Sequence, residues 1–174
     1  MTTTVSSFCA TVVPMSTTAL NLGQLLCADI PADQFGRRPE GVSCNTPAWV
    51  IGHLSLYPER ILGFIGREDL VQSDERLNDL FKAGSESPDD PDGSYYPSKQ
   101  ELLDRFAERT QAVIEALSTV DPEVLERENP IEGRFREMFP TIGGMVAFLL
   151  GGHTMMHLGQ ISTWRRCMGL GSAM

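Results

Sequence analysis

Four separate stretches of the chain carry apolar residues at intervals of three and four positions, the spacing that places side chains on one face of an α-helix. They run from about Met15 to Asp29, from Pro47 to Gly66, from Ser98 to about residue 119, and from Thr141 to about Met168. Sustained alternation of apolar and polar residues, the pattern of a half-buried strand, does not occur over five or more positions. The sequence therefore predicts an all-α protein, a four-helix bundle.

The ends of these predicted helices carry residues that suit helix termini. Thr46 can accept a hydrogen bond from an unpaired backbone N–H, and Pro47 suits the first helical position because its missing N–H would have had no partner. Ser98 begins an S-x-x-E capping box. Gly169 is expected to end the last helix. Pro58 lies inside the second pattern and predicts a kink, either as a tolerated bend or as a feature that widens a cavity.

The connection formed by residues 67–97 differs in composition from the helices. It contains one short amphipathic piece, Glu75 to Lys82, followed by an acidic stretch rich in turn-forming residues. We interpret it as a long polar crossover on the surface. Its segment 75–97 is either a solvated connector, which we favour, or a rim of a pocket to which Tyr95 and Tyr96 contribute. The whole chain, 1–174, is expected to form one domain whose first 12 residues or so are loose.

Composition excludes several classes of function. The formal net charge is −9, from 23 acidic and 14 basic residues. Such a surface repels phosphate, so neither nucleic-acid binding nor attachment to an anionic membrane through a basic patch is expected. No stretch reaches about 18 apolar residues, as a membrane-spanning helix would need, and the N-terminus lacks the features of a signal peptide. We therefore expect a soluble, cytoplasmic protein that acts on a small molecule.

The cysteines do not form a recognisable motif. They stand at Cys9, Cys27, Cys44 and Cys167, without a C-x-x-C pair, so a dithiol redox site or a tetrathiolate zinc site is not indicated. We interpret them as reduced core residues and leave any role of Cys44 and Cys167 open. Phosphate-binding glycine loops and the G-x-S-x-G element of serine hydrolases do not occur either.

All three histidines of the chain fall on apolar faces of predicted helices. His153 and His157 are four residues apart on the last helix and therefore project from the same side, while His53 lies on the inward face of the second helix. Buried imidazoles need partners for their ring nitrogens, and a shared metal ion would satisfy all three. The spacing alone leaves two other interpretations open: core histidines with protein partners, or a surface pair.

The residues around these histidines resemble a known family. The stretch from Asn45 to Leu54 reads NTPAWVIGHL and the stretch from His153 to Ile161 reads HTMMHLGQI. Both resemble motifs of the DinB/YfiT-like superfamily, and the resemblance extends from about Leu20 to Leu170. It implies a four-helix bundle of up-up-down-down order with long crossover connections. It also implies that His53 and the two last-helix histidines hold a divalent metal, nickel or zinc, and that the protein is a homodimer.

Three neutral ligands would leave a metal ion with an open coordination position, which is the arrangement of catalytic rather than structural sites. The motif HTMMH lacks the glutamate of H-E-x-x-H, so a zincin peptidase is not expected. Because characterised members of the superfamily use thiol cofactors, the resemblance suggests a thiol-dependent S-transferase or a related detoxifying, hydrolase-type activity. The alternatives are a metal-dependent binding or sensor protein without turnover, and a purely structural metal. Gln160 could orient a ligand or substrate, or form a hydrogen bond in the core or at the rim without a functional role.

Overall fold

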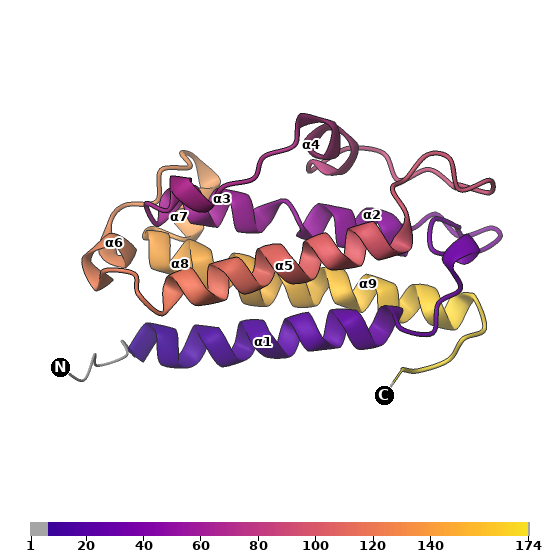
Figure 1. The fold of residues 1–174 in the computed structure, drawn as a ribbon, viewed down its shortest axis with the longest axis horizontal. Helices are drawn as coiled ribbons and strands as arrows, with labels where there is room; N and C mark the ends of the chain where they lie inside the picture. The colour runs from indigo at the N-terminus through magenta and orange to yellow at the C-terminus, as the bar shows by residue number, and fades with distance from the viewer. Residues whose placement is uncertain (1–6, 174) are drawn as a thin grey trace.

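The computed structural model describes residues 7–173, and the prediction of an all-α fold is confirmed (Figure 1). Four long helical segments lie side by side. They are α1 (Ser7–Cys27); α2 (Pro47–Leu54) followed by α3 (Tyr57–Phe64); α5 (Lys99–Leu117); and α8 (Ile142–Ala147), a π-helical segment (Phe148–His153) and α9 (Thr154–Cys167). Helix α1 packs against α5 and α9, and α2 packs against the same two helices from the opposite side.

The order of helix directions differs from the prediction. Met15 lies against Gly151 and Gly23 lies against Leu158, so α1 and α9 run in the same direction. Helices α2, α3 and α5 run the other way (Figure 1). The bundle is therefore up-down-down-up, and the expected up-up-down-down order is wrong. The reason is that the link between α1 and α2 stays at one end of the bundle, which forces these two helices to be antiparallel.

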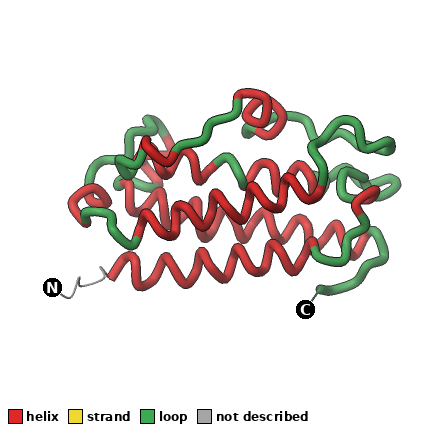
Figure 2. The backbone as a smooth tube through the Cα atoms, in the orientation of Figure 1, coloured by secondary structure: helices red, strands yellow, loops and turns green. Residues whose placement is uncertain are grey.

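Only one connection between the four long segments runs the length of the bundle (Figure 2). It joins α3 to α5 and contains a 3₁₀ turn (Glu68–Leu70) and the short helix α4 (Glu75–Phe81), close to the predicted piece. The link from α5 to α8 remains at one end and contains α6 (Pro122–Glu126) and α7 (Arg134–Met138). A further 3₁₀ turn (Ala32–Gln34) lies between α1 and α2.

The first helix begins earlier than its apolar pattern indicated. It is already helical at Ser7, and Cys9 and Val12 are buried, so the expectation of a loose N-terminus is wrong for residues 7–12. Residues 1–6 lie outside the described part. Leu25, one of the large apolar residues of this stretch, is 47% exposed. The face that packs inward consists largely of small residues, which a search for large apolar side chains overlooks.

The predicted helix ends are confirmed. The Thr46 hydroxyl accepts a hydrogen bond from the Trp49 N–H at 3.2 Å. The Ser98 capping box forms in both directions. Gly169 follows the last helix with a φ of 78°, a left-handed conformation that favours glycine.

The second predicted helix is interrupted at residues 55–56, where α2 ends and α3 begins with Pro58 in its first turn. The predicted kink is thus confirmed. Since proline cannot donate the next helical hydrogen bond, the turn before it loosens. The Ser55 hydroxyl donates to the carbonyl of Gly52 at 2.7 Å and satisfies one carbonyl of this turn.

The crossover is attached to the bundle, so the interpretation of a solvated connector is wrong for several of its residues. Phe81 is fully buried against α2, and Tyr96 is 7% exposed, whereas Tyr95 is 44% exposed. The buried Asp90 carboxylate accepts hydrogen bonds from three backbone N–H groups, among them those of Ser94 and Tyr96. At least one acidic residue of this segment therefore holds the crossover together through hydrogen bonds to its backbone.

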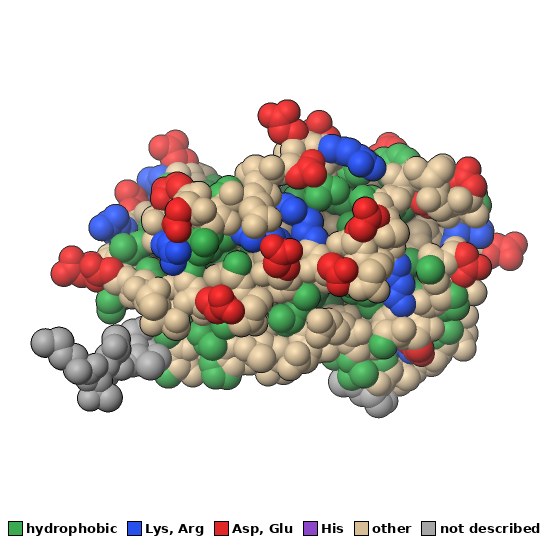
Figure 3. All heavy atoms as spheres, viewed as in Figure 1, with side chains coloured by type: hydrophobic (Ala, Val, Ile, Leu, Met, Phe, Trp, Pro, Cys, Tyr) green, Lys and Arg blue, Asp and Glu red, His purple; other side chains and the backbone are tan. Residues whose placement is uncertain are grey.

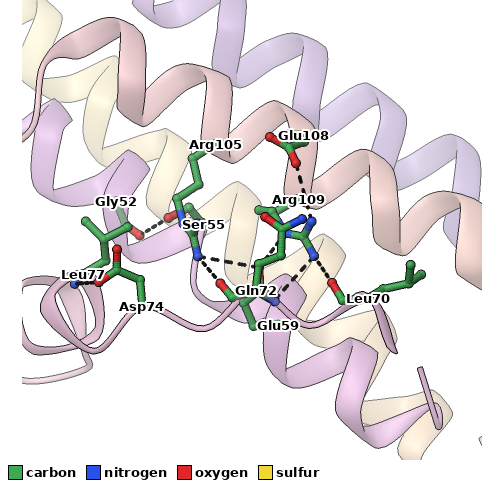
Figure 4. A network of polar contacts seen from close by, with 10 residues as sticks. All are labelled: Gly52, Ser55, Glu59, Leu70, Gln72, Asp74, Leu77, Arg105, Glu108 and Arg109. Carbon is green, nitrogen blue, oxygen red and sulfur yellow. Dashed lines mark hydrogen bonds and ion pairs between the residues drawn. The ribbon is translucent and has the colours of Figure 1, made fainter. Parts of the chain in front are cut away.

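A buried ion pair ties the crossover to α3 and α5 (Figure 4). The Glu59 carboxylate accepts a hydrogen bond from the Arg109 Nε at 2.5 Å and another from the backbone N–H of Gln72 at 2.6 Å. Arg109 also donates to the Leu70 carbonyl at 2.6 Å, and Arg105 donates to the Gln72 carbonyl at 2.8 Å. One carboxylate thus joins two helices and the start of the crossover.

The surface carries the acidic charge expected from the sequence. Acidic side chains are spread over the face shown in Figure 3, and no histidine is visible on that face. Among residues 7–173, no helix is both long and apolar enough to cross a membrane.

Candidate metal site

The three histidines meet between α2 and the start of α9. The ring centroids of His53 and His157 are 4.6 Å apart, those of His153 and His157 are also 4.6 Å apart, and those of His53 and His153 are 5.3 Å apart. Each side chain is buried, with 3% to 7% of the residue exposed. The structure thus brings together all three residues that the sequence singled out.

His53 is oriented by the end of α4. Its Nδ1 lies 2.7 Å from the backbone carbonyl of Phe81, the last residue of that helix. A carbonyl only accepts, so Nδ1 carries the proton and donates it. The other ring nitrogen, Nε2, is then left with a lone pair, and this is the arrangement found for metal-binding histidines. Nothing in the sequence signalled this contact, because the two residues are far apart in the chain.

His157 is linked to a polar pair at the edge of the site. Its Nδ1 lies 3.3 Å from the side-chain oxygen of Gln160, and the same oxygen accepts a hydrogen bond from the Asn45 side chain at 3.1 Å. The oxygen therefore favours a proton on Nδ1 of His157. Gln160 thus forms hydrogen bonds at the edge of the site, and its contact with His157 also lets it orient that histidine.

His153 has a different environment. Its Nδ1 is buried and has no hydrogen-bond partner among the described residues. It lies at the end of the π-helical segment, where the Thr154 hydroxyl donates to the carbonyl of Leu149 at 2.9 Å. Wide turns of this kind inside an α-helix are frequent at functional sites. A buried nitrogen without a partner costs stability unless something else binds there.

Aromatic rings enclose the histidines on two sides. Trp49 stacks on His53 at 4.6 Å with an interplanar angle of 13°. Tyr57, the first residue of α3, approaches His153 at 4.3 Å and meets His53 edge-on at 5.0 Å. The break between α2 and α3 thus places the Tyr57 ring beside the histidines, and the pocket that Leu54, Tyr57 and Pro58 help to line is small, about 10 Å³. The guanidinium of Arg60 lies 5.3 Å from the centre of the Tyr57 ring.

Burial keeps the three imidazoles neutral. It lowers the pKa of His53 to about 4 and that of His153 to about 3, and it also lowers the pKa of His157. The neighbouring histidines and Arg60 act on His53 and His153 in the same direction. Neutral imidazole is the form that binds metal ions, so the site needs no proton release at pH 7.

The donor set fits a divalent metal ion. One nitrogen from each histidine lies within 4.8 Å of the other two, and within residues 7–173 no cysteine, aspartate or glutamate joins this group. The unpartnered nitrogen of His153 and the fixed tautomer of His53 both suit such an ion. Structural zinc sites use four protein ligands. A metal ion held by these three nitrogens would therefore keep at least one coordination position open.

The fold and this site define a class of protein, a helical bundle with a buried three-histidine group that could hold a metal ion. The chain belongs to the DinB superfamily, whose family model matches residues 19–161. The match confirms the resemblance drawn from the two histidine motifs. No curated protein matches the chain at a significant level.

Replacing Gly52 by alanine should weaken metal binding through the support of His53. A Cβ at Gly52 would lie 2.5–2.6 Å from the ring of Phe81, which has no space to retreat because it is fully buried. We expect a loss of about 1–3 kcal/mol in the free energy of unfolding. Because the Phe81 carbonyl must shift with its ring, metal affinity should fall about 10- to 100-fold. Chemical denaturation and metal titration measure the two effects.

Gly63→Ala is the matched control, since a Cβ there meets no atom within 4 Å. It should leave metal affinity unchanged. If Gly52→Ala bound metal as tightly as the parent protein, the role assigned to Phe81 would be wrong.

The metal-free protein should lose stability in mild acid. The pKa values of His53 and His153 lie below the ordinary value of 6.5 in the folded state. At pH values between the folded-state pKa and 6.5, the unfolded chain therefore binds more protons than the folded protein. The free energy of unfolding should therefore be level above pH 7 and fall below it. By pH 5.5 the loss should be about 1 kcal/mol for each histidine. Urea denaturation of chelator-treated protein measures it, and a His53→Gln/His153→Gln variant should show a correspondingly smaller fall.

Proposed function

We propose that the protein is a metal-dependent enzyme that transfers a low-molecular-weight thiol to an electrophilic small molecule. The observation that carries this proposal is the donor set, which consists of three buried neutral histidines without an acidic or thiol ligand beside them among the described residues. Membership of the DinB superfamily supports it, because the resemblance stated above includes thiol-dependent relatives.

A divalent ion held by His53, His153 and His157 would lower the pKa of a thiol bound at its open position. In the overall reaction the thiol sulfur forms a bond to an electrophilic carbon, the bond from that carbon to its leaving group breaks, the leaving group departs with the electron pair, and the thiol proton passes to solvent. We take nickel or zinc as the metal, following the resemblance, since imidazole ligands alone do not distinguish among divalent ions.

The residues of the chain have separate tasks in this proposal. The Phe81 carbonyl and the Gln160 side chain hold two histidines in the tautomer that keeps Nε2 available. Trp49 and Tyr57 exclude water from one side of the site. The positive charge of Arg60 lies close enough to influence His53 and His153, and it favours an anionic group such as a thiolate.

The test begins with elemental analysis of the purified protein. Metal-loaded protein is then offered bacillithiol, mycothiol or glutathione together with monochlorobimane, whose fluorescence reports the thioether product. Catalysed product formation that requires metal and disappears in His157→Ala supports the proposal. Tight binding of the thiol without product formation would instead indicate a binding or sensor protein. A metal whose removal lowers the melting temperature, in protein that neither binds nor consumes thiol, would indicate a structural ion.

A further inference from the structure

A groove on the surface of the bundle runs along α9, beside the segment that precedes α2. Its cavity volume is about 530 Å³, which falls within the usual range for small-molecule sites, about 300–1,000 Å³. Its walls include Val42, Asn45, Met156, Gly159, Gln160 and Trp164. Asn45, Met156, Gly159 and Gln160 belong to the two histidine-containing stretches, but the sequence did not show that they line one groove, because its two sides come from distant parts of the chain.

The groove lies next to the three-histidine site. Gln160 lines the groove, and the same side chain contacts Nδ1 of His157 at 3.3 Å. Asn45, from the opposite wall, donates to the Gln160 oxygen. Met156 precedes His157 on the helix and also lines the groove. A molecule in the groove would therefore contact the polar pair that orients one of the histidines.

The lining of the groove is uncharged. It contains no aspartate, glutamate, lysine, arginine or histidine, in a protein whose formal net charge is −9. Cys44 and Cys167 supply thiols, and burial raises the pKa of Cys44, which keeps it uncharged. Two apolar wall residues are unusually open to solvent, Met156 at 56% and Val42 at 41%. Cys167 is exposed and Cys44 is partly buried, so the interpretation of the cysteines as core residues is wrong for these two, whereas Cys9 and Cys27 are buried.

We infer that the groove binds an uncharged, largely apolar small molecule whose one polar group reaches the Asn45–Gln160 pair. Charged ligands would lose hydration there, and no lining residue would offer them a charge of opposite sign. Covering Met156 and Val42 would remove exposed apolar surface from water. Identifying this ligand as the electrophilic acceptor rests on the proposed function, whereas its binding does not.

The experiment uses two dyes with the same aromatic body. N-Phenyl-1-naphthylamine is neutral, and 1-anilinonaphthalene-8-sulfonate carries one negative charge. The neutral dye should bind metal-free protein with a fluorescence increase, at least about 10-fold more tightly than the sulfonate.

Gly159→Leu is the blocking variant. A Cβ at Gly159 meets no atom within 4 Å, so the side chain enters the groove without a clash, and leucine suits a helix better than glycine. Dye affinity should fall at least about 10-fold, while metal stoichiometry should be retained. Gly63→Leu, which adds the same side chain at another uncrowded helical position, should bind the dye like the parent protein.

Three results would overturn the inference: equal dye affinity in Gly159→Leu, a preference for the sulfonate, or loss of dye binding as the chain dimerises in analytical ultracentrifugation. The last would show that a second copy of the chain covers the groove. None of these measurements requires metal or thiol, so a failure here is separate from a failure of the proposed function. If the groove does hold the acceptor, Gly159→Leu should raise KM for monochlorobimane and leave KM for the thiol unchanged.

Discussion

His157→Ala should abolish stoichiometric metal binding. The variant keeps two of the three nitrogen ligands. Removing a residue that only orients a metal ligand typically lowers metal affinity about 10- to 100-fold. Because this substitution removes a ligand itself, we expect metal affinity to fall more than about 100-fold. In the parent protein, metal at 100 times its dissociation constant should stabilise the fold by about 2.7 kcal/mol. That stabilisation should be absent in the variant. Inductively coupled plasma analysis and thermal unfolding with and without metal measure both effects.

Met156→Ala is the control for this prediction. Met156 precedes His157 on the same helix but is 56% exposed and offers no nitrogen, so its removal should leave metal binding intact. A His157→Ala protein that still held one ion per chain at the parent affinity would contradict the three-histidine site. Circular dichroism of the metal-free variant shows whether a loss of metal binding comes from the missing ligand or from loss of the fold.

Arg109→Leu should produce the largest loss of stability among these variants. It leaves the Glu59 carboxylate, which is 8% exposed, without its closest positive partner. Breaking a buried ion pair from one side typically costs about 3–5 kcal/mol, and we expect the lower end because Arg105 remains 3.7 Å from Glu59. The hydrogen bond from the Arg109 side chain to the Leu70 carbonyl of the crossover is lost as well. Urea denaturation measures the change.

Two further variants separate the buried charge from other effects. Glu59→Gln in the Arg109→Leu background removes the uncompensated charge and should recover about half of the loss or more. Asp69→Asn breaks the exposed Arg67–Asp69 pair in the same crossover and should change stability far less than Arg109→Leu does, because exposed pairs contribute little. If the double variant were no more stable than Arg109→Leu, packing rather than charge would explain the effect.

The features predicted correctly from the sequence are those that depend on residues within about one helical turn of each other. The four-residue interval between His153 and His157, the capping box at Ser98 and the turn at Gly169 are of this kind. Each is set by the geometry of the backbone between neighbouring residues, so the local sequence is sufficient. Local spacing was not sufficient to assign His53 to the same site. That prediction also used its position on an apolar helix face and the family motif around it.

Tertiary structure alone decided the features that join distant segments. The Phe81 carbonyl beside His53, the Glu59–Arg109 pair and the groove along α9 each bring together residues at least 28 positions apart. The same holds for the order of helix directions, where the sequence-based expectation was wrong. Such contacts follow from which helices pack together and where the crossover lies, and these depend on the whole chain burying its apolar surface at once. The sequence by itself determined the helices and the residue types that could hold a metal ion, and packing determined what surrounds them.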